Sequence, residues 1–202
     1  KGRAHTSEGW MLIDEIIQSR RDHDREWFEV EMMGMRPSTG GLVYAPDLVR
    51  LAFGGSVPDS PGTSPAIGHD WGFSGESFMV QISVRDGIVW VDKAEFWNQT
   101  SDTIIIERVS SLAKEISAYV LADSSHPFQN DTLSKLCDDF RPVVFSKEKM
   151  TGVGYVKHLF EKRLLRIPDI SPGHRRLYNQ LRNYMKDEET GKPVKKDDHG
   201  PD

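Results

Sequence analysis

Cysteine is nearly absent from this sequence, and its scarcity limits the chemistry that the chain can carry. The single thiol, Cys137, excludes a disulfide within the chain and is typical of a protein from a reducing compartment. No apolar run approaches the roughly 18 residues that a membrane-spanning helix requires. The first residues also lack the apolar centre of a signal peptide. We therefore expect a soluble, cytosolic protein whose sequence begins at an internal boundary of a longer chain.

A phosphate-binding loop is missing as well. The pattern GxxxxGK[ST], which holds nucleotide phosphates in many ATPases, does not occur, so this piece alone is not expected to hydrolyse ATP. Apolar residues make up 37% of the 202 residues, and five residues are Trp. This content is sufficient for a packed core and for one domain with an appendage.

Charge is distributed unevenly along the chain. The net charge is −5, but residues 147–196 carry 13 Lys and Arg against 6 Asp and Glu, whereas the remainder carries 13 against 25. A basic surface beside an acidic site suits an enzyme that cuts phosphodiesters, because cations hold phosphates and carboxylates hold metal ions. Taken alone, the segregation is explained more simply by solvated surface helices.

The sequence changes character at a segment rich in Gly, Pro and Ser. Residues 54–65 (GGSVPDSPGTSP) have the composition of a linker, so we place a domain boundary between residues 1–60 and 61–202. Before this boundary, apolar residues at helical spacing predict an amphipathic helix over residues 7–21. After it, the pattern changes to strands that later alternate with helices.

Five segments with strand character follow the boundary, at residues 65–71, 76–85, 88–96, 117–122 and 142–145. The second and third are joined by Asp86-Gly87, a typical hairpin turn. Helical periodicity over residues 103–115 and from Pro127 onward separates the last three strands, which favours parallel pairing through right-handed crossovers. The expected fold is α/β, with helices flanking a five-stranded mixed sheet. Strands 1–3 form an antiparallel meander, and strands 4 and 5 run parallel to strand 1.

Carboxylates stand at the ends of two of these strands. Asp70 ends the first strand and Asp123 ends the fourth, and this topology makes the two strands neighbours. Ligands bind in the crevice at the carboxyl ends of parallel strands. Two carboxylates brought together repel each other unless a cation intervenes, and Mg²⁺ typically takes one or two carboxylates. The pair predicts a metal site, although a single Asp at a strand end is more often a turn residue or cap.

A third acidic cluster lies near the end of the sequence. Asp198, His199 and Asp202 are spaced so that a helix beginning there would place His199 and Asp202 on one face. Runs of mixed charge in this position are usually solvated tails. The combination of all three clusters, in this order and at these element ends, is what favours a metal-binding role.

The order of these elements resembles the ribonuclease H-like plan, and within it the nuclease domain of the tailed-bacteriophage terminase large subunit. The motifs that carry the resemblance are residues 68–72 (GHDWG), 122–127 (ADSSHP) and 197–202 (DDHGPD). Residues 27–31 (WFEVE) through 41–44 (GLVY) are similar to the exit from the terminase ATPase domain. By this resemblance, residues 1–60 are a C-terminal remnant of the ATPase domain with its linker, and residues 61–202 are the nuclease domain.

The resemblance implies a metal-dependent endonuclease that cuts concatemeric viral DNA during genome packaging, with little sequence specificity. Two Mg²⁺ or Mn²⁺ ions roughly 3.5–4 Å apart would bridge the scissile phosphate. Asp70, Asp123 and Asp202 would be the catalytic, metal-binding carboxylates, with Asp198 and His199 as accessory ligands. The residues expected to hold DNA by its phosphates are Arg175, Arg176, Arg182, Lys192, Lys195 and Lys196.

Partners and location are implied in the same way. Double-stranded DNA would be the substrate, and the terminase ATPase domain, the small terminase subunit and the portal would be the protein partners. The chain would act in the host cytoplasm, away from any membrane, and would not remain in the mature virion. Two alternatives stay open. One is a non-catalytic module that docks a motor on a portal, for which divalent ions should not stabilise the fold. The other is a different ribonuclease H-like nuclease, such as a junction resolvase or transposase.

Overall fold

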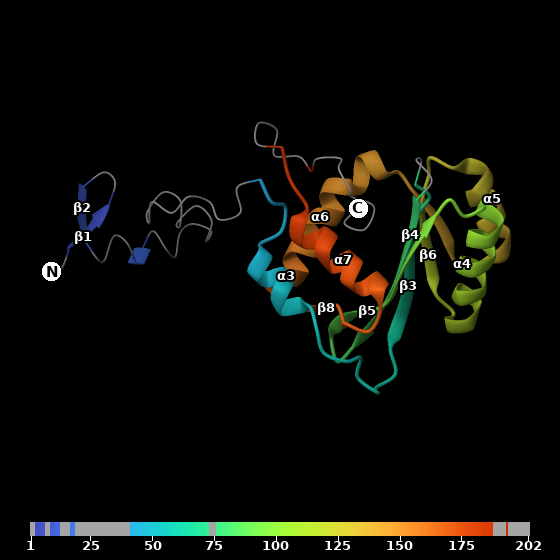
Figure 1. The fold of residues 1–202 in the computed structure, drawn as a ribbon, viewed down its shortest axis with the longest axis horizontal. Helices are drawn as coiled ribbons and strands as arrows, with labels where there is room; N and C mark the ends of the chain where they lie inside the picture. The colour runs from blue at the N-terminus through green and yellow to red at the C-terminus, as the bar shows by residue number, and fades with distance from the viewer. Residues whose placement is uncertain are drawn as a thin grey trace. The chain divides into compact units, whose positions relative to one another are not determined.

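The computed structural model describes most of the chain, namely residues 3–6, 9–12, 17–18, 41–72, 76–187 and 193. It divides into two compact units, Lys1–Gly41 and Leu42–Asp202. The second unit contains the sheet and the helices that are described below (Figure 1). Within the described residues, every helix is too short or too polar to span a membrane.

The first unit contains two short strands that pair with each other. Its strands, β1 (Arg3–Thr6) and β2 (Gly9–Leu12), pair in antiparallel register from Arg3 opposite Leu12 to Thr6 opposite Gly9. The helix expected over residues 7–21 is therefore wrong at residues 9–12. The helical spacing of apolar residues does not reveal that residues 3–6 supply a strand partner, and backbone pairing with that strand replaces helical hydrogen bonds.

A six-stranded mixed sheet forms the centre of the second unit, with the strand order β7-β6-β3-β4-β5-β8. The strands are β3 (Thr63–Asp70), β4 (Glu76–Arg85), β5 (Ile88–Asn98), β6 (Tyr119–Asp123), β7 (Phe140–Val143) and β8 (Leu165–Arg166). β3, β4 and β5 form the antiparallel meander, while β6 pairs parallel to β3 and β7 pairs parallel to β6. The five-stranded α/β plan is confirmed, and β8 adds a short sixth strand parallel to β5.

The meander depends on a tight turn that the sequence signals clearly. Asp86 and Gly87 connect β4 to β5, and both have positive φ, at 51° and 75°. A type I′ turn requires positive φ at both of its central residues, and its twist matches that of the flanking strands. The turn therefore sets the register of the hairpin, with Arg85 opposite Ile88.

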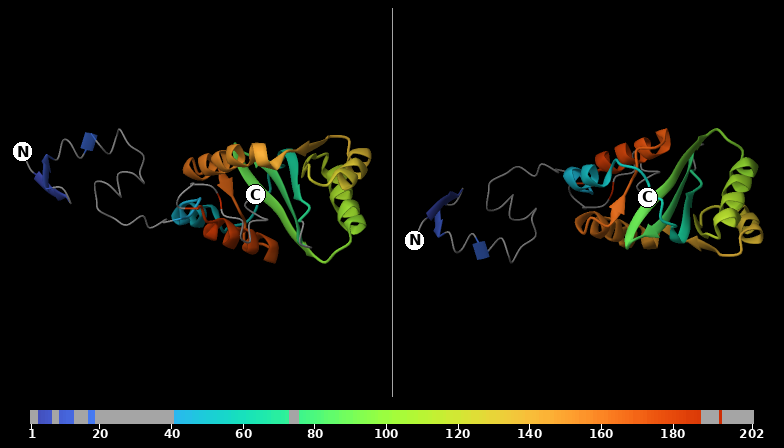
Figure 2. Two further views of the ribbon diagram at one scale, coloured as in Figure 1. Left: turned by 90° about the horizontal axis from the view of Figure 1, so that it is seen from above. Right: turned by 90° about the horizontal axis from the view of Figure 1, so that it is seen from below.

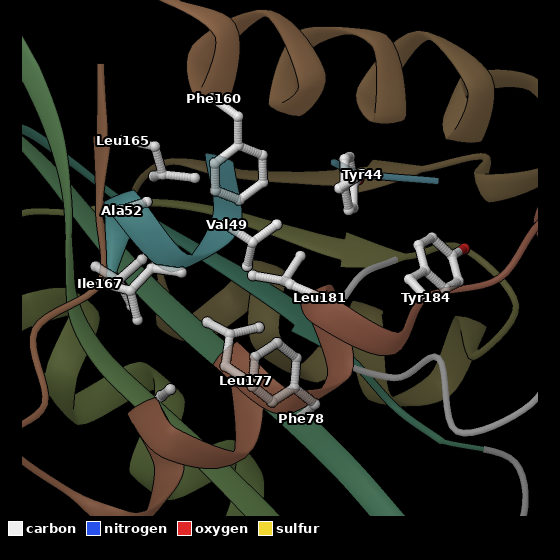
Figure 3. Packing of buried hydrophobic residues seen from close by; sticks show 12 residues of the cluster. Tyr44, Val49, Ala52, Phe78, Phe160, Leu165, Ile167, Leu177, Leu181 and Tyr184 are labelled. Carbon is white, nitrogen blue, oxygen red and sulfur yellow. The ribbon is translucent and has the colours of Figure 1, made fainter. Parts of the chain in front are cut away.

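Helices cover both faces of the sheet, as the two views in Figure 2 show. One face packs against α4 (Asp102–Ile116) and α5 (Pro127–Leu136). The other packs against α3 (Pro46–Ala52), α6 (Phe145–Glu161) and α7 (Pro172–Asn183). Neighbouring residues of β4 belong to the hydrophobic clusters on opposite faces of the sheet. Met79 packs with Ile105 and Leu133 on one face. Phe78 packs with Leu177 on the other face (Figure 3). This alternation is the period of two that identified the strand.

Residues just after Gly41 belong to the same unit as the sheet. The Tyr44 ring packs on Phe160 and Tyr184, and the Ile167 amide donates to the Ala52 carbonyl at 2.8 Å. The two compact units meet in the sequence at residues 41/42. The domain boundary expected at residues 60/61 stays a prediction. A Gly- and Pro-rich composition signals irregular backbone, and here such backbone connects α3 to β3 within one packed unit. The identification of residues 1–60 as an ATPase remnant remains a prediction.

The start of α7 is fixed closely to β5. Ser171 caps the helix by accepting a hydrogen bond from the His174 amide. The buried His174 ring donates from Nε2 to the Val91 carbonyl at 3.0 Å. At Gly173 the two backbones approach so closely that a Cβ atom would lie 1.8 Å from the Ala94 carbonyl oxygen. These contacts hold α7 over the sheet beside the cavity that is described next.

Candidate active site

Asp70 and Asp123 end two neighbouring strands. β3 and β6 are parallel and paired from Ala66 opposite Tyr119 to His69 opposite Ala122, so the two carboxylates stand opposite each other one position beyond the last pair. Residues that are opposite in a parallel pair project from the same face of the sheet. Both aspartates line a single cavity of about 500 Å³.

This cavity lies between the sheet and the helices α6 and α7. Apolar side chains such as Phe78, Val80 and Leu177 form much of its wall. The charged residues that line it are Asp70, Asp123, Arg141, Glu148 and Lys149. It thus brings three carboxylates and two cations into one largely apolar cavity.

The carboxylate of Asp123 is held by the turn that follows it. The Ser125 amide donates to Asp123 Oδ1 at 3.3 Å, and the Ser125 hydroxyl donates to Asp123 Oδ2. Ser125 Oγ also lies 2.8 Å from Nδ1 of His126. Because the serine hydroxyl already donates its proton to Asp123, Nδ1 is the donor in this second hydrogen bond and Oγ the acceptor. Groups that hold a metal-binding side chain in this way fix its orientation.

The carboxylate of Asp70 is oriented by a glycine turn. The Gly72 amide lies 3.3 Å from Asp70 Oδ1. Gly72 has a φ of +56°, and a Cβ atom there would lie 1.3 Å from the Glu76 carbonyl oxygen. Only glycine fits such an approach between backbones. The GHDWG motif therefore requires its last glycine for a structural reason.

His69 lies beside Asp70 in sequence but faces the opposite layer. Its ring is 5% exposed and meets the Trp71 ring edge-on, with ring centres 4.3 Å apart. Burial lowers the pKa of His69 to about 3, so the ring is neutral near pH 7. We therefore assign this histidine to the core between the sheet and α4.

The third acidic cluster is not part of the chain that the structure describes. Asp198, His199 and Asp202 lie outside the described residues, as do Lys192, Lys195 and Lys196. Among the residues that are described, no group of three or more His, Cys, Asp and Glu side chains is arranged to hold a metal ion. Of the five predicted ligands, the structure describes Asp70 and Asp123, and it brings these two to one cavity.

The predicted arginines of α7 lie apart from this cavity. Arg175 makes a bidentate pair with Asp169, at 2.9 Å to both carboxylate oxygens, and this pairing raises the pKa of Arg175. Arg176 pairs with Glu76 and lies 4.1 Å from the centre of the Phe96 ring. The remaining arginine of this set, Arg182, is an exposed residue of α7.

Sequence reasoning missed the cations that do line the cavity. Arg141 is on β7 and Lys149 is on α6. Arg141 lies 3.8 Å from Glu148, and both side chains are more than half exposed, so this pair is weak. The parallel pairing of β7 with β6 could have suggested that β7 reaches the same edge of the sheet. The helical position of Lys149 relative to the sheet has no comparable signal.

Solved structures share this fold. The large terminase of a thermophilic bacteriophage matches with a TM-score of 0.68 at 15% identity, over 94% of this chain and 49% of that chain. The nuclease domain of the P22 large terminase matches with a TM-score of 0.56 at 13% identity, over 74% and 82% of the two chains. The large terminase nuclease of another thermophilic phage, G20c, with bound cobalt, matches with a TM-score of 0.56 at 17% identity, over 76% and 86%.

These matches establish a ribonuclease H-like fold of the large-terminase nuclease type. The G20c nuclease has also been solved with bound zinc. The chain spans about half the length of the first of these proteins, the thermophilic-bacteriophage large terminase. No protein-family model matches the sequence, and comparison with curated protein sequences finds no significant match.

Proposed function

We propose that this chain is the nuclease part of a phage large terminase, a metal-dependent endonuclease that cuts concatemeric viral DNA during genome packaging. The observation that carries the proposal is the position of Asp70 and Asp123, opposite each other at the ends of adjacent parallel strands and lining one cavity. The fold shared with the thermophilic-bacteriophage large terminase and with the P22 and G20c nucleases supports it.

The residues present fit a site for divalent cations. Carboxylate oxygens are the ligands that Mg²⁺ and Mn²⁺ prefer, and the G20c nuclease has been solved with cobalt and with zinc. Asp70 and Asp123 would hold two Mg²⁺ or Mn²⁺ ions together with Asp202, with Asp198 and His199 as accessory ligands. Bound there, such ions would supply an activated water and stabilise the leaving oxygen of the phosphodiester.

The chain's own residues prepare the site for this reaction. The Gly72 amide and the Ser125 turn hold the two carboxylates in fixed orientations. Arg141 and Lys149 line the same cavity and would hold the DNA backbone through its phosphates, without reading sequence. The other proposed DNA contacts, farther along the chain, are Arg175, Arg176, Arg182, Lys192, Lys195 and Lys196.

We extend the proposal to the organisation of the whole protein. The match to the thermophilic-bacteriophage large terminase covers 94% of this chain, whereas the match to the isolated P22 nuclease domain covers 74%. That difference supports residues 1–60 as a remnant of the ATPase domain and its linker. The partners would then be the ATPase domain, the small terminase subunit, the portal and double-stranded DNA. The protein would act in the host cytoplasm and be absent from the mature virion.

A nicking assay tests the activity. Supercoiled plasmid is incubated with the protein and Mg²⁺ or Mn²⁺, with and without a chelator. Asp70→Asn and Asp123→Asn should each lose more activity than the roughly 10–100-fold typical for partners outside the first coordination sphere. Asp131→Asn is the matched control, because Asp131 is an exposed residue of α5 that pairs with Lys135. Cutting that persists in either site variant would refute the assignment.

The choice of DNA separates the proposed nuclease from related enzymes of the same fold. A packaging nuclease should cut linear and supercoiled duplexes, with no preference for branches. A junction resolvase would instead prefer four-way junctions by a large factor. Parallel assays on linear duplex DNA and on four-way junctions, at equal Mn²⁺ concentration, distinguish these outcomes.

A further inference from the structure

The recorded pairing between the strands that carry Asp70 and Asp123 ends just before these two residues. The pairs between β3 and β6 end at His69 opposite Ala122. Beyond that point Asp70 remains paired with Phe78 of β4. On the other side, the Ser124 amide donates to the Val143 carbonyl of β7 at 2.8 Å. The direct ladder between the two strands thus stops one residue before the carboxylates.

A side chain from α5 links the two strand ends. The Asn130 amide group donates from Nδ2 to the Asp123 carbonyl at 2.7 Å. Its Oδ1 accepts from the Trp71 indole Nε1 at 3.0 Å. The orientation of the amide is unambiguous, because an indole N–H can only donate and a carbonyl can only accept. Asn130 therefore connects the residue after Asp70 with the backbone of Asp123.

The surroundings make this bridge rigid. Asn130 is 6% exposed, and its own backbone amide donates to the His126 carbonyl at 3.0 Å. Trp71 is 3% exposed, and its carbonyl accepts from the Ser77 hydroxyl at 2.7 Å. Asparagine is a weak helix former, so its place within α5 reflects these tertiary contacts and not local propensity.

We infer that Asn130 is a positioning residue that sets the spacing of Asp70 and Asp123 for metal binding. This inference rests on the proposed function. Asn130 and Trp71 are absent from the lining of the cavity, so neither would contact the DNA that occupies it. Their effect should be confined to the affinity for metal ions and to the chemical step, with the affinity for DNA unchanged.

The test compares Asn130→Ala and Trp71→Phe with Gln129→Ala, all in the full chain. Gln129 is the neighbouring residue on α5, and its side chain binds Asp102 instead of the strand ends. Mn²⁺ binding is measured by calorimetry without DNA, and kcat and KM are measured in the nicking assay. Asn130→Ala should raise the Kd for Mn²⁺ about 10–100-fold and lower kcat at limiting Mn²⁺, with KM for DNA within about twofold of wild type. Saturating Mn²⁺ should restore part of the lost kcat.

Trp71→Phe removes only one anchor of the bridge and should give a smaller effect in the same direction. It also serves if Asn130→Ala fails to fold. Mn²⁺ affinity and kcat equal to those of Gln129→Ala in the folded variants would overturn the inference while leaving the proposed nuclease intact. A wild-type protein that neither binds Mn²⁺ nor cuts DNA would instead overturn the proposed function, and this inference with it.

Discussion

At the scale of single residues, the turns after β3 and β6 do more than end the strands. Gly72 permits a close backbone approach and presents its amide to Asp70, while Ser125 donates twice to Asp123. A carboxylate held by such donors keeps a fixed orientation, which is what a metal ligand needs. The strand-end aspartates could be identified from the sequence because an apolar run ends at each. The Asn130 bridge could not, because it depends on how α5 packs on the sheet.

The burial of the His69 ring can be tested through the pH dependence of the free energy of unfolding. The pKa of His69 is about 3 in the folded chain and 6.5 in the reference state, so the unfolded chain binds more protons between these pH values. The free energy of unfolding should therefore fall as the pH drops below about 6.5, by up to roughly 1.4 kcal/mol per pH unit from this group. Denaturant unfolding from pH 7.5 to pH 5, with a chelator present, measures the slope. His69→Leu should reduce the slope of the free energy of unfolding against pH. A variant with the same slope as the wild type would show that the ring is solvated in the folded chain.

At the scale of elements, the sequence predicted those with a strong periodic or turn signal. β4, with its alternating residues, and the Asp86-Gly87 turn are examples. β8 has only two residues, too few to show a period, and becomes a strand because β5 offers it an edge. The helix α3 also depends on tertiary contacts. It belongs to the same core as residues more than a hundred positions away, such as Phe160 and Leu177.

The docking of α7 on β5 can be tested with paired glycine substitutions. Gly173→Ala would place a methyl group 1.8 Å from the Ala94 carbonyl oxygen, so the helix must shift. We expect a loss of about 1–3 kcal/mol in the free energy of unfolding, the usual cost of overpacking. Gly154→Ala in α6 meets no atom within 4 Å and should be neutral or stabilising by up to about 1 kcal/mol. Equal effects in chemical denaturation would contradict the described packing.

At the scale of the whole molecule, the net charge of −5 does not show which Lys and Arg side chains line the cavity. The basic stretch over residues 147–196 suggested arginines of α7 as DNA contacts, but Arg175 and Arg176 are engaged with Asp169 and Glu76. Arg141 comes before that stretch and lines the cavity nonetheless. Charge counted along a sequence does not show which side chains converge in space, and this is why the count did not single out Arg141.

DNA binding at different salt concentrations separates the two sets of cations. The double substitution Arg141→Ala with Lys149→Ala should weaken binding to all sequences alike and reduce the slope of log K against log salt by up to about 2. Arg175→Ala with Arg176→Ala should change the slope less, because neither side chain lines the cavity that contains Asp70 and Asp123. Fluorescence anisotropy with the Asp70→Asn background, in Ca²⁺, avoids cleavage. The reverse order of effects would place the DNA on α7.

Diffraction from a crystal soaked in Mn²⁺ tests whether Asp70 and Asp123 bind metal ions, because anomalous scattering locates the ions independently of activity. We expect peaks within bonding distance of carboxylate oxygens of both Asp70 and Asp123, and we expect these peaks to be lost in a crystal of Asp70→Asn. The absence of any peak between these two strand ends after a soak at saturating Mn²⁺ would contradict metal binding by Asp70 and Asp123. The carboxylates would then serve as turn residues, and the domain would be better understood as a docking module of the packaging motor.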